Sequence, residues 1–406
     1  MTASVSSHRP DAHTDALCTP EFRLLLHCLR EGALPPEFVP PDWDLLLCAA
    51  ERHAVLPLVH RALARHGQVP ATARETLESL FRVGLAKNLF LSAELLRLLD
   101  GLSQHGISVL PYKGPTLAQS LYGDIALRSF SDLDLLVRMH DVQPAAEALE
   151  ALGYVAQQPV PPDRRRAHLA LASEQMFRRR EGAALVELQW RIAPSYFSVD
   201  FDFEWFWRTA VRVPLGSRQV PALAPEALLL ALAVHGAKHG WESLVWIVDI
   251  AQLLESHPGL DWDSVLRHAR FLGIERLLFL ALALAEKLTG AALPVAVRQQ
   301  AASDTTVPWL VQRVEWKLAG ELHGVPNLTD HCFSLGGRER WRDRFRYVAR
   351  IALTPNPRDW ALLPLPSPLA PLYFVVRAIR MLGRMARFAG RRVFGASRAP
   401  HSEINT

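Results

Sequence analysis

Cysteine is scarce in this 406-residue sequence, and the few cysteines present form no recognisable pattern. None belongs to a CxxC pair and none has a histidine at metal-ligand spacing, so neither a zinc site nor a disulfide framework is indicated. We expect buried or free thiols in a reducing compartment. The four cysteines are Cys18, Cys28, Cys48 and Cys332.

Long apolar runs are also missing. Residues 1–19 are polar and lack the apolar segment of a secretory signal, and we expect them to be disordered. The longest candidate for a membrane span, residues 362–381, is broken by four prolines and two arginines, so no transmembrane helix is predicted. The protein is therefore expected to be cytoplasmic.

Lysine is rare as well: only five of the 45 basic residues are lysines, so a lysine at a sensitive position is informative. The formal net charge of +4 is too small to indicate a general polyanion-binding surface. Residues 338–398, however, hold fourteen arginines against three acids, a local balance of +11. Nucleic acid is not an expected partner, because no groove of basic and aromatic residues is apparent outside this segment.

Five arginines near the C-terminus recur every three or four residues, which would place them on one face of a helix. This face predicts weak contact with an anionic membrane surface, although a solvated basic helix face is the favoured alternative. The five are Arg377, Arg380, Arg384, Arg387 and Arg391.

Hydrophobic periodicity divides the chain into five regions. After the disordered residues 1–19, residues 20–105 have helical spacing, residues 106–215 mix short β-rich segments with helices, and residues 216–355 are again helical. Residues 356–406 form a Pro-rich joint and the basic tail. This pattern predicts an α+β fold with a small mixed-sheet core between two helical regions. The expected N-terminal helices are 22–29, 43–64 and 71–102. The expected strands are 106–113, 133–137, 175–178 and 184–190, with 201–209 as an aromatic-rich connector.

Two acids, Asp132 and Asp134, are two residues apart at the expected strand 133–137. Side chains at this spacing project from the same face of a strand, so the two carboxylates repel each other unless a cation lies between them. Hard oxygen ligands of this kind suit Mg²⁺ or Mn²⁺. The alternative is an edge strand whose polar face is solvated.

Further polar residues surround this pair in the sequence. Lys113-Gly114 ends one strand and opens a helix, where a glycine lets the backbone approach a phosphate and the helix N-terminus supplies N–H donors; an ordinary tight turn is the alternative. Arg128 and Ser131 come shortly before the two acids. Glu187 is a third acid inside an apolar strand, where a metal would compensate its charge, unless the side chain faces outward.

A later helical motif carries His235, Lys238 and His239. The two histidines are four residues apart and so share a helix face, but the glutamate of a zinc-protease motif is missing. They are either a core pair packed with Trp241 and Trp246, or part of a lid in which Lys238 or His239 contacts a bound ligand. Asp249 is expected to be a structural partner of one of these cations.

Taken together, these motifs resemble a family of nucleotidyltransferases, most without an established substrate, within the DNA polymerase β-like nucleotidyltransferase superfamily. The resemblance spans roughly residues 80–260. Pro115 replaces the serine that usually follows the glycine, Gly114 lies eighteen residues before Asp132, and Gln189 stands where the family often has histidine. The matching segments are Lys113-Gly114, Tyr122, Arg128, 132–137, 186–190, 235–241 and 246–250.

The resemblance implies a Mg²⁺-dependent (or Mn²⁺-dependent) enzyme that moves a nucleoside monophosphate from a nucleoside triphosphate such as ATP to an unknown small-molecule, peptide or protein acceptor. Asp132, Asp134 and Glu187 would be the catalytic and metal-binding residues. The implied nucleotide-binding residues are Lys113, Gly114, Arg128, Ser131, Lys238 and His239. The alternative is a non-catalytic nucleotide-binding or regulatory module with the same fold, although the intact acidic trio favours the enzyme.

Overall fold

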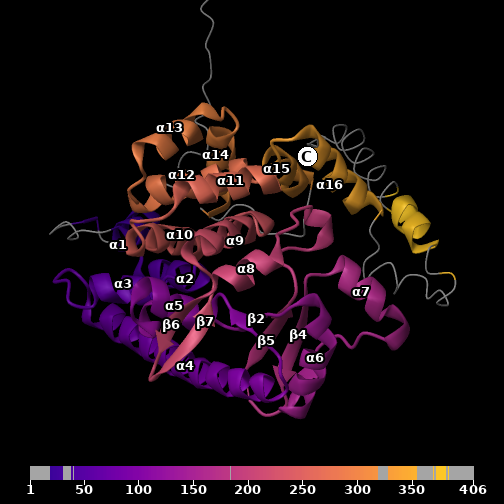
Figure 1. Ribbon diagram of the computed structural model, residues 1–406. Helices are drawn as coiled ribbons and strands as arrows, with labels where there is room; N and C mark the ends of the chain where they lie inside the picture. The colour runs from indigo at the N-terminus through magenta and orange to yellow at the C-terminus, as the bar shows by residue number, and fades with distance from the viewer. Residues whose placement is uncertain are drawn as a thin grey trace, which may run out of the picture.

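The computed structural model describes most of the chain, and in this part helices surround a five-stranded mixed sheet (Figure 1). This arrangement confirms the expected α+β fold. The expected disordered N-terminus and most of the expected basic tail lie outside the described residues. None of the described helices is long and apolar enough to cross a membrane. The described residues are 19–30, 38–39, 41–182, 184–318, 328–353, 369, 372–380 and 383.

The N-terminal helices are α1 (Pro20–Leu29), α2 (Trp43–Arg52), α3 (Leu56–Leu63) and α4 (Ala71–Gln104). The sequence predicts one helix over 43–64, and the structure divides it into α2 and α3. Ala54 between them has a φ of 55°, a left-handed conformation that interrupts a right-handed helix, and Pro57 lies in the first turn of α3. The 34-residue α4 runs along the sheet at the bottom of the view in Figure 1.

The sheet has the strand order β1-β2-β5-β4-β3. Its strands are β1 (Leu110–Pro111), β2 (Leu133–Leu136), β3 (Tyr154–Ala156), β4 (Glu174–Arg179) and β5 (Leu185–Gln189). The central pair, β2 and β5, is parallel, and the other neighbours are antiparallel. The sheet is therefore mixed.

The two faces of the central strands differ in polarity. Alternate apolar residues on one face lie in a core cluster with α4 and α6 (Val142–Ala151); they are Leu133, Leu135, Val186 and Leu188. Because successive side chains of a strand point to opposite faces, Asp134 and Glu187 lie on the other face. That face looks toward the C-terminal helices.

Several local predictions need correction. Only Leu110–Pro111 of the expected strand 106–113 pairs in the sheet, and this strand ends at Pro111, which has no N–H to donate to a neighbouring strand. The expected connector 201–209 contains helix α8 (Phe203–Thr209), whose N-terminus is capped by the Asp202 side chain. Strand β3 was not predicted.

A hairpin of β6 (Val211–Leu215) and β7 (Arg218–Ala222) was also not predicted. Gly216 has a φ of 59° in its two-residue turn, a conformation that favours glycine. The hairpin packs beside α5 (Gly114–Tyr122) and β1, so it supports the segment that leads into α5.

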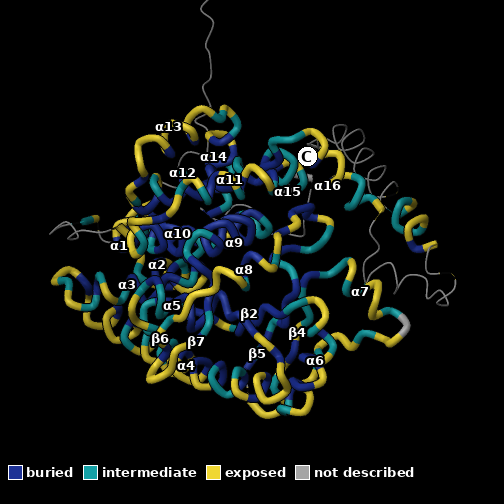
Figure 2. Tube along the Cα trace, in the orientation of Figure 1, coloured by how far each residue is buried: buried dark blue, intermediate teal, exposed yellow. Residues whose placement is uncertain are grey.

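The C-terminal helices form a layer over the polar face of the sheet. α9 is apolar on all sides because α10, α11 and α12 all pack against it, and it is buried in the middle of the molecule (Figure 2). α10 also contacts α5, which links this layer to the sheet region. These helices are α9 (Pro225–Lys238), α10 (Leu244–Ser256), α11 (Trp262–Leu272), α12 (Glu275–Thr289), α13 (Val295–Ser303), α14 (Val307–Leu318), α15 (Leu328–Gly336) and α16 (Trp341–Leu353).

Candidate active site

A cleft of about 780 Å³ lies where the polar face of β2 and β5 meets the start of α5 and the end of α9. Every residue that the sequence predicts for the site lines this cleft: Lys113, Gly114, Arg128, Ser131, Asp132, Asp134, Glu187, Lys238 and His239. The fold therefore brings together residues that are up to 126 positions apart in the chain. Other lining residues come from α2, α4, β4 and α10 and include Glu51, Lys87, Glu174 and Trp246.

The acids occupy neighbouring strands. Asp132 lies directly before β2, and Asp134, within β2, is the register partner of Glu187 in the parallel strand β5. The Gln189 amide Nε2 donates to Asp134 Oδ1 and to Glu187 Oε2, each at 2.8 Å, so these two oxygens are no more than twice that distance apart. The Tyr112 hydroxyl donates to Gln189 Oε1 at 2.8 Å, which turns the NH₂ group toward the acids.

Lys113 forms an ion pair with one of these acids, Asp134. Its Nζ lies 2.7 Å from Asp134 Oδ1, and both side chains are almost fully buried. Burial alone would lower the pKa of Lys113, but the neighbouring Asp134 carboxylate, with Tyr112 and Glu187, raises it above its usual value. Lys113 is therefore a protonated ammonium that compensates the charge of Asp134.

Gly114 begins α5 directly after Lys113. Its φ of 61° favours glycine, and a Cβ at this position would stand 3.3 Å from the backbone carbonyl oxygen of Asp132. The turn and the chain that carries the acids thus approach closely. Backbone N–H groups in the first turn of α5 have no partner within the helix and can bind an anion at the edge of the cleft.

Arg128 is held by a partner in the C-terminal region. Its Nε and Nη2 donate to the two carboxylate oxygens of Asp249 in α10, each at 2.8 Å, and the Tyr122 hydroxyl donates to the same carboxylate at 2.7 Å. Asn88 Nδ2 donates to the backbone carbonyls of Arg128 and Ile125. Asp249 is a structural partner of a cation, as expected, but the cation is Arg128. A nucleotide contact by Arg128 stays a prediction.

Comparison with protein families assigns the chain to one of them. A family described as "Uncharacterised nucleotidyltransferase" matches residues 40–290, more than half of the chain. The chain belongs to this family. Membership supports a general nucleotidyltransferase role and a nucleoside triphosphate substrate. A search of curated proteins finds no match, and neither does a search of solved structures.

Negative charge in the cleft of this nucleotidyltransferase is only partly compensated. Burial, together with Asp134 and Glu174, raises the pKa of Glu187 to about 8. Burial and the charge of Asp134 also raise the pKa of Asp132. Both shifts show that a further positive charge would stabilise the ionised acids. An all-oxygen donor set of this kind fits Mg²⁺ or Mn²⁺.

These donors are not already arranged as a complete metal site. In the part of the chain that the structure describes, no group of three or more His, Cys, Asp or Glu side chains is placed to hold a metal ion. Asp134 Oδ1 instead forms an ion pair with Lys113 and accepts a hydrogen bond from Gln189. The donor chemistry fits a divalent cation, although Asp134 Oδ1 already has these two partners.

The end of α9 forms one wall of the cleft. The rings of His235 and His239 are 4.8 Å apart, and Trp246 packs against both. Burial lowers the pKa of both histidines, with further contributions from Lys113 at His235 and from Lys238 at His239; the pKa of His239 falls to about 3. Both rings are therefore neutral at pH 7. A lid role for Lys238 or His239 stays a prediction.

A glycine between the two histidines has a steric reason. A Cβ on Gly236 would lie 2.5 Å from the Trp241 ring, so no larger residue fits while Trp241 occupies this position. Trp241 is fully buried and has a φ of 54°, which brings its side chain back onto α9. The Gly-Ala-Lys-His-Gly-Trp motif thus fixes the wall that carries Lys238 and His239.

Sequence reasoning missed two buried residues behind the acids. Tyr112 and Gln189 orient Asp134 and Glu187, and the sequence shows Gln189 only as a departure from the family pattern. The scarcity of lysine was a usable signal: Lys87, Lys113 and Lys238 line the cleft. Lys317 donates to the backbone carbonyl of His239 at 3.2 Å, so four of the five lysines are at or beside the site.

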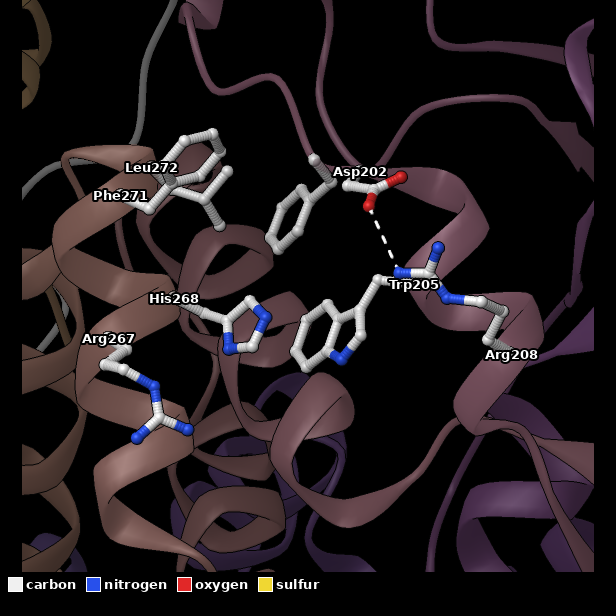
Figure 3. A pocket seen from close by; sticks show the side chains of 8 residues that line it. Asp202, Trp205, Arg208, Arg267, His268, Phe271 and Leu272 are labelled. Atoms are coloured by element: carbon white, nitrogen blue, oxygen red, sulfur yellow. Dashed lines mark ion pairs between the residues drawn. The ribbon is translucent and has the colours of Figure 1, made fainter.

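A second, smaller cavity of about 250 Å³ lies between α8 and α11 (Figure 3). In it the Trp205 and His268 rings stack at 4.0 Å, and Arg208 is 3.6 Å from Asp202. None of the predicted site residues lines this cavity. It is separate from the candidate active site.

Proposed function

We propose that the protein is a Mg²⁺-dependent (or Mn²⁺-dependent) nucleotidyltransferase that moves a nucleoside monophosphate from a nucleoside triphosphate to an acceptor and releases pyrophosphate. One observation carries the proposal: Asp132, Asp134 and Glu187 come from adjacent strands into one cleft, beside a lysine and a strand-to-helix turn. The acceptor is a small molecule, a peptide or a protein.

In this proposal Asp132, Asp134 and Glu187 hold the divalent cation, which when bound would neutralise phosphate charge and lower the pKa of an attacking hydroxyl. The first turn of α5 and Lys113 bind the phosphates. Gln189, fixed by Tyr112, keeps Asp134 and Glu187 at a constant separation. Ser131, Lys238 and His239 complete the nucleotide-binding wall.

The bond changes follow from this arrangement. The acceptor oxygen forms a bond to the α-phosphorus, and the bond from that phosphorus to the bridging oxygen of the β-phosphate breaks. A Glu187 carboxylate oxygen accepts the proton of the acceptor hydroxyl. Lys113 and the α5 backbone N–H groups stabilise the leaving pyrophosphate.

The proposal is tested by transfer of label from α-³²P nucleoside triphosphates to small-molecule and protein fractions of a cell extract, with Asp134→Asn as the inactive control. Label in a new product, together with pyrophosphate release and dependence on Mg²⁺, supports the enzyme. Nucleotide binding with no transfer in any fraction favours the non-catalytic nucleotide-binding or regulatory module. The absence of Mg²⁺-dependent nucleotide binding refutes both.

We also propose a weak contact with anionic membrane surfaces in a cytoplasmic protein. Of the predicted arginine face, only Arg377 and Arg380 lie within the described residues, and Arg377 Nε donates to the Ile351 carbonyl at the end of α16. α16 itself supports such a contact. Trp341 and Phe345, four residues apart, are 80% and 70% exposed, and arginines flank this apolar face.

A further inference from the structure

One of the three proposed metal ligands, Asp134, is already paired with a cation. Asp134 is 2% exposed, and its Oδ1 forms an ion pair with the Lys113 ammonium at 2.7 Å and accepts a hydrogen bond from the Gln189 amide at 2.8 Å. A buried carboxylate without a partner costs much more free energy than a paired one. Lys113 therefore supplies the positive charge that Asp134 requires in the free protein.

The type of residue at this position matters. Lysine is a compact charge on a flexible stem and can exchange partners, whereas the planar guanidinium of arginine holds a carboxylate in a fixed two-bond geometry. This chain uses arginine for a fixed pair: Arg128 donates twice to Asp249. It has only five lysines, and one of them pairs with Asp134.

The surroundings allow such an exchange. Lys113 lines the cleft and directly precedes Gly114, where the N-terminus of α5 can bind an anion. Gln189 donates to Asp134 and to Glu187 and is itself fixed by Tyr112. These bonds would keep the two acids in position after Lys113 has moved.

We propose that Lys113 is an exchangeable counter-ion: it neutralises Asp134 in the free protein and moves to the phosphates when a nucleotide and a divalent cation bind together. This inference rests on the proposed function and adds that the nucleotide and the divalent cation bind cooperatively. A metal ion alone binds weakly, because it displaces the Lys113 ammonium from Asp134 and gives that ammonium no other anion to pair with. A nucleotide supplies that anion, so each ligand raises the affinity for the other by the same factor.

The test measures Mn²⁺ binding directly, by calorimetry and by the electron paramagnetic resonance signal of free Mn²⁺, with and without a non-hydrolysable ATP analogue. We expect the wild type to bind Mn²⁺ weakly alone and at least about tenfold more tightly with the analogue, the factor for roughly one charge-assisted hydrogen bond. Lys113→Met should bind Mn²⁺ alone about tenfold more tightly than the wild type and should lose most of the coupling. It should also bind the analogue more weakly.

Lys87→Met is the charge-matched control, since Lys87 lines the same cleft from α4 and its removal subtracts the same unit charge. If Lys87→Met and Lys113→Met raise the Mn²⁺ affinity equally, the loss of one positive charge from the cleft explains the effect, and the exchange is refuted. Lower Mn²⁺ affinity in Lys113→Met refutes it as well. Lys113→Gln, which keeps a hydrogen-bond donor for Asp134, gives the same comparison if the methionine variant does not fold.

The wild type provides an independent measurement that needs no variant. If it binds Mn²⁺ equally well with and without the analogue, the exchange is wrong while the proposed function stands. If it binds neither ligand, the proposed function itself fails. The two failures are therefore distinguishable.

Discussion

Replacing Arg128 tests the buried ion pair that connects the sheet region to α10 of the C-terminal helices. The side chain is 5% exposed and that of Asp249 is 0% exposed, and two bonds of 2.8 Å join them. Arg128→Met would leave the buried Asp249 carboxylate without its cation, while the Tyr122 hydroxyl still donates to it. Breaking a buried ion pair from one side costs about 3–5 kcal/mol, so we expect a loss of this size in the free energy of unfolding.

Equilibrium urea denaturation followed by circular dichroism measures this loss. The double variant Arg128→Met with Asp249→Leu removes both charges and should regain most of the stability, because paired apolar side chains often replace a buried ion pair at little cost. Arg218 and Asp100 form a similar two-bond pair at the surface, with side chains 44% and 51% exposed, so Arg218→Met should have little effect. The reasoning fails if Arg128→Met is no more harmful than Arg218→Met, or if the double variant recovers nothing.

Three further predictions concern the cleft wall, the turn and α16. Burial lowers the pKa of His239 from its usual 6.5 to about 3, so the folded protein binds fewer protons than the unfolded chain between these values and loses stability as the pH falls. In His239→Gln the slope of unfolding free energy against pH should be smaller by up to about 1.4 kcal/mol per pH unit; an unchanged slope in urea titrations from pH 7 to pH 4 would contradict this. Gly114→Ala adds a Cβ at a φ of 61° and should cost about 1–2 kcal/mol and weaken nucleotide binding, whereas Gly67→Ala, in open space, should have little effect on binding. Trp341→Ser with Phe345→Ser should reduce sedimentation with anionic vesicles at low salt and leave nucleotide binding unchanged; equal sedimentation of the variant and the wild type excludes α16 as the membrane contact.

The central strands and the direction of their acids can be predicted because apolar and polar side chains alternate along each strand. Leu133 and Leu135 alternate with Asp134, and the same alternation surrounds Glu187, so the buried face and the cleft face could be predicted from each segment alone. The short strand β3 and the turn at Gly216 give much weaker local signals. The aromatic segment 201–209 lacks a long period, and its helix depends on the cap by Asp202.

Contacts between distant residues could not be predicted in the same way. Arg128 and Asp249 are 121 residues apart, and no local pattern indicates that this arginine binds an acid of α10. The contact between Lys113 and Asp134 likewise depends on how the turn before α5 packs against β2. The orientation of the Gln189 amide is set by a hydrogen bond from Tyr112, which directly follows β1. Such pairings follow from tertiary packing, which sequence periodicity does not encode.

Calorimetric titration of the protein with ATP, in the presence and absence of Mg²⁺, tests the central claim most directly. Asp132→Asn and Asp134→Asn each keep the size of the side chain and remove one charge. If the account is right, the wild type binds ATP in a Mg²⁺-dependent manner, and the double asparagine variant folds as the wild type does, as judged by circular dichroism, but no longer shows this dependence. Undiminished Mg²⁺-dependent ATP binding by the folded double variant would contradict the assignment of these two acids to the metal.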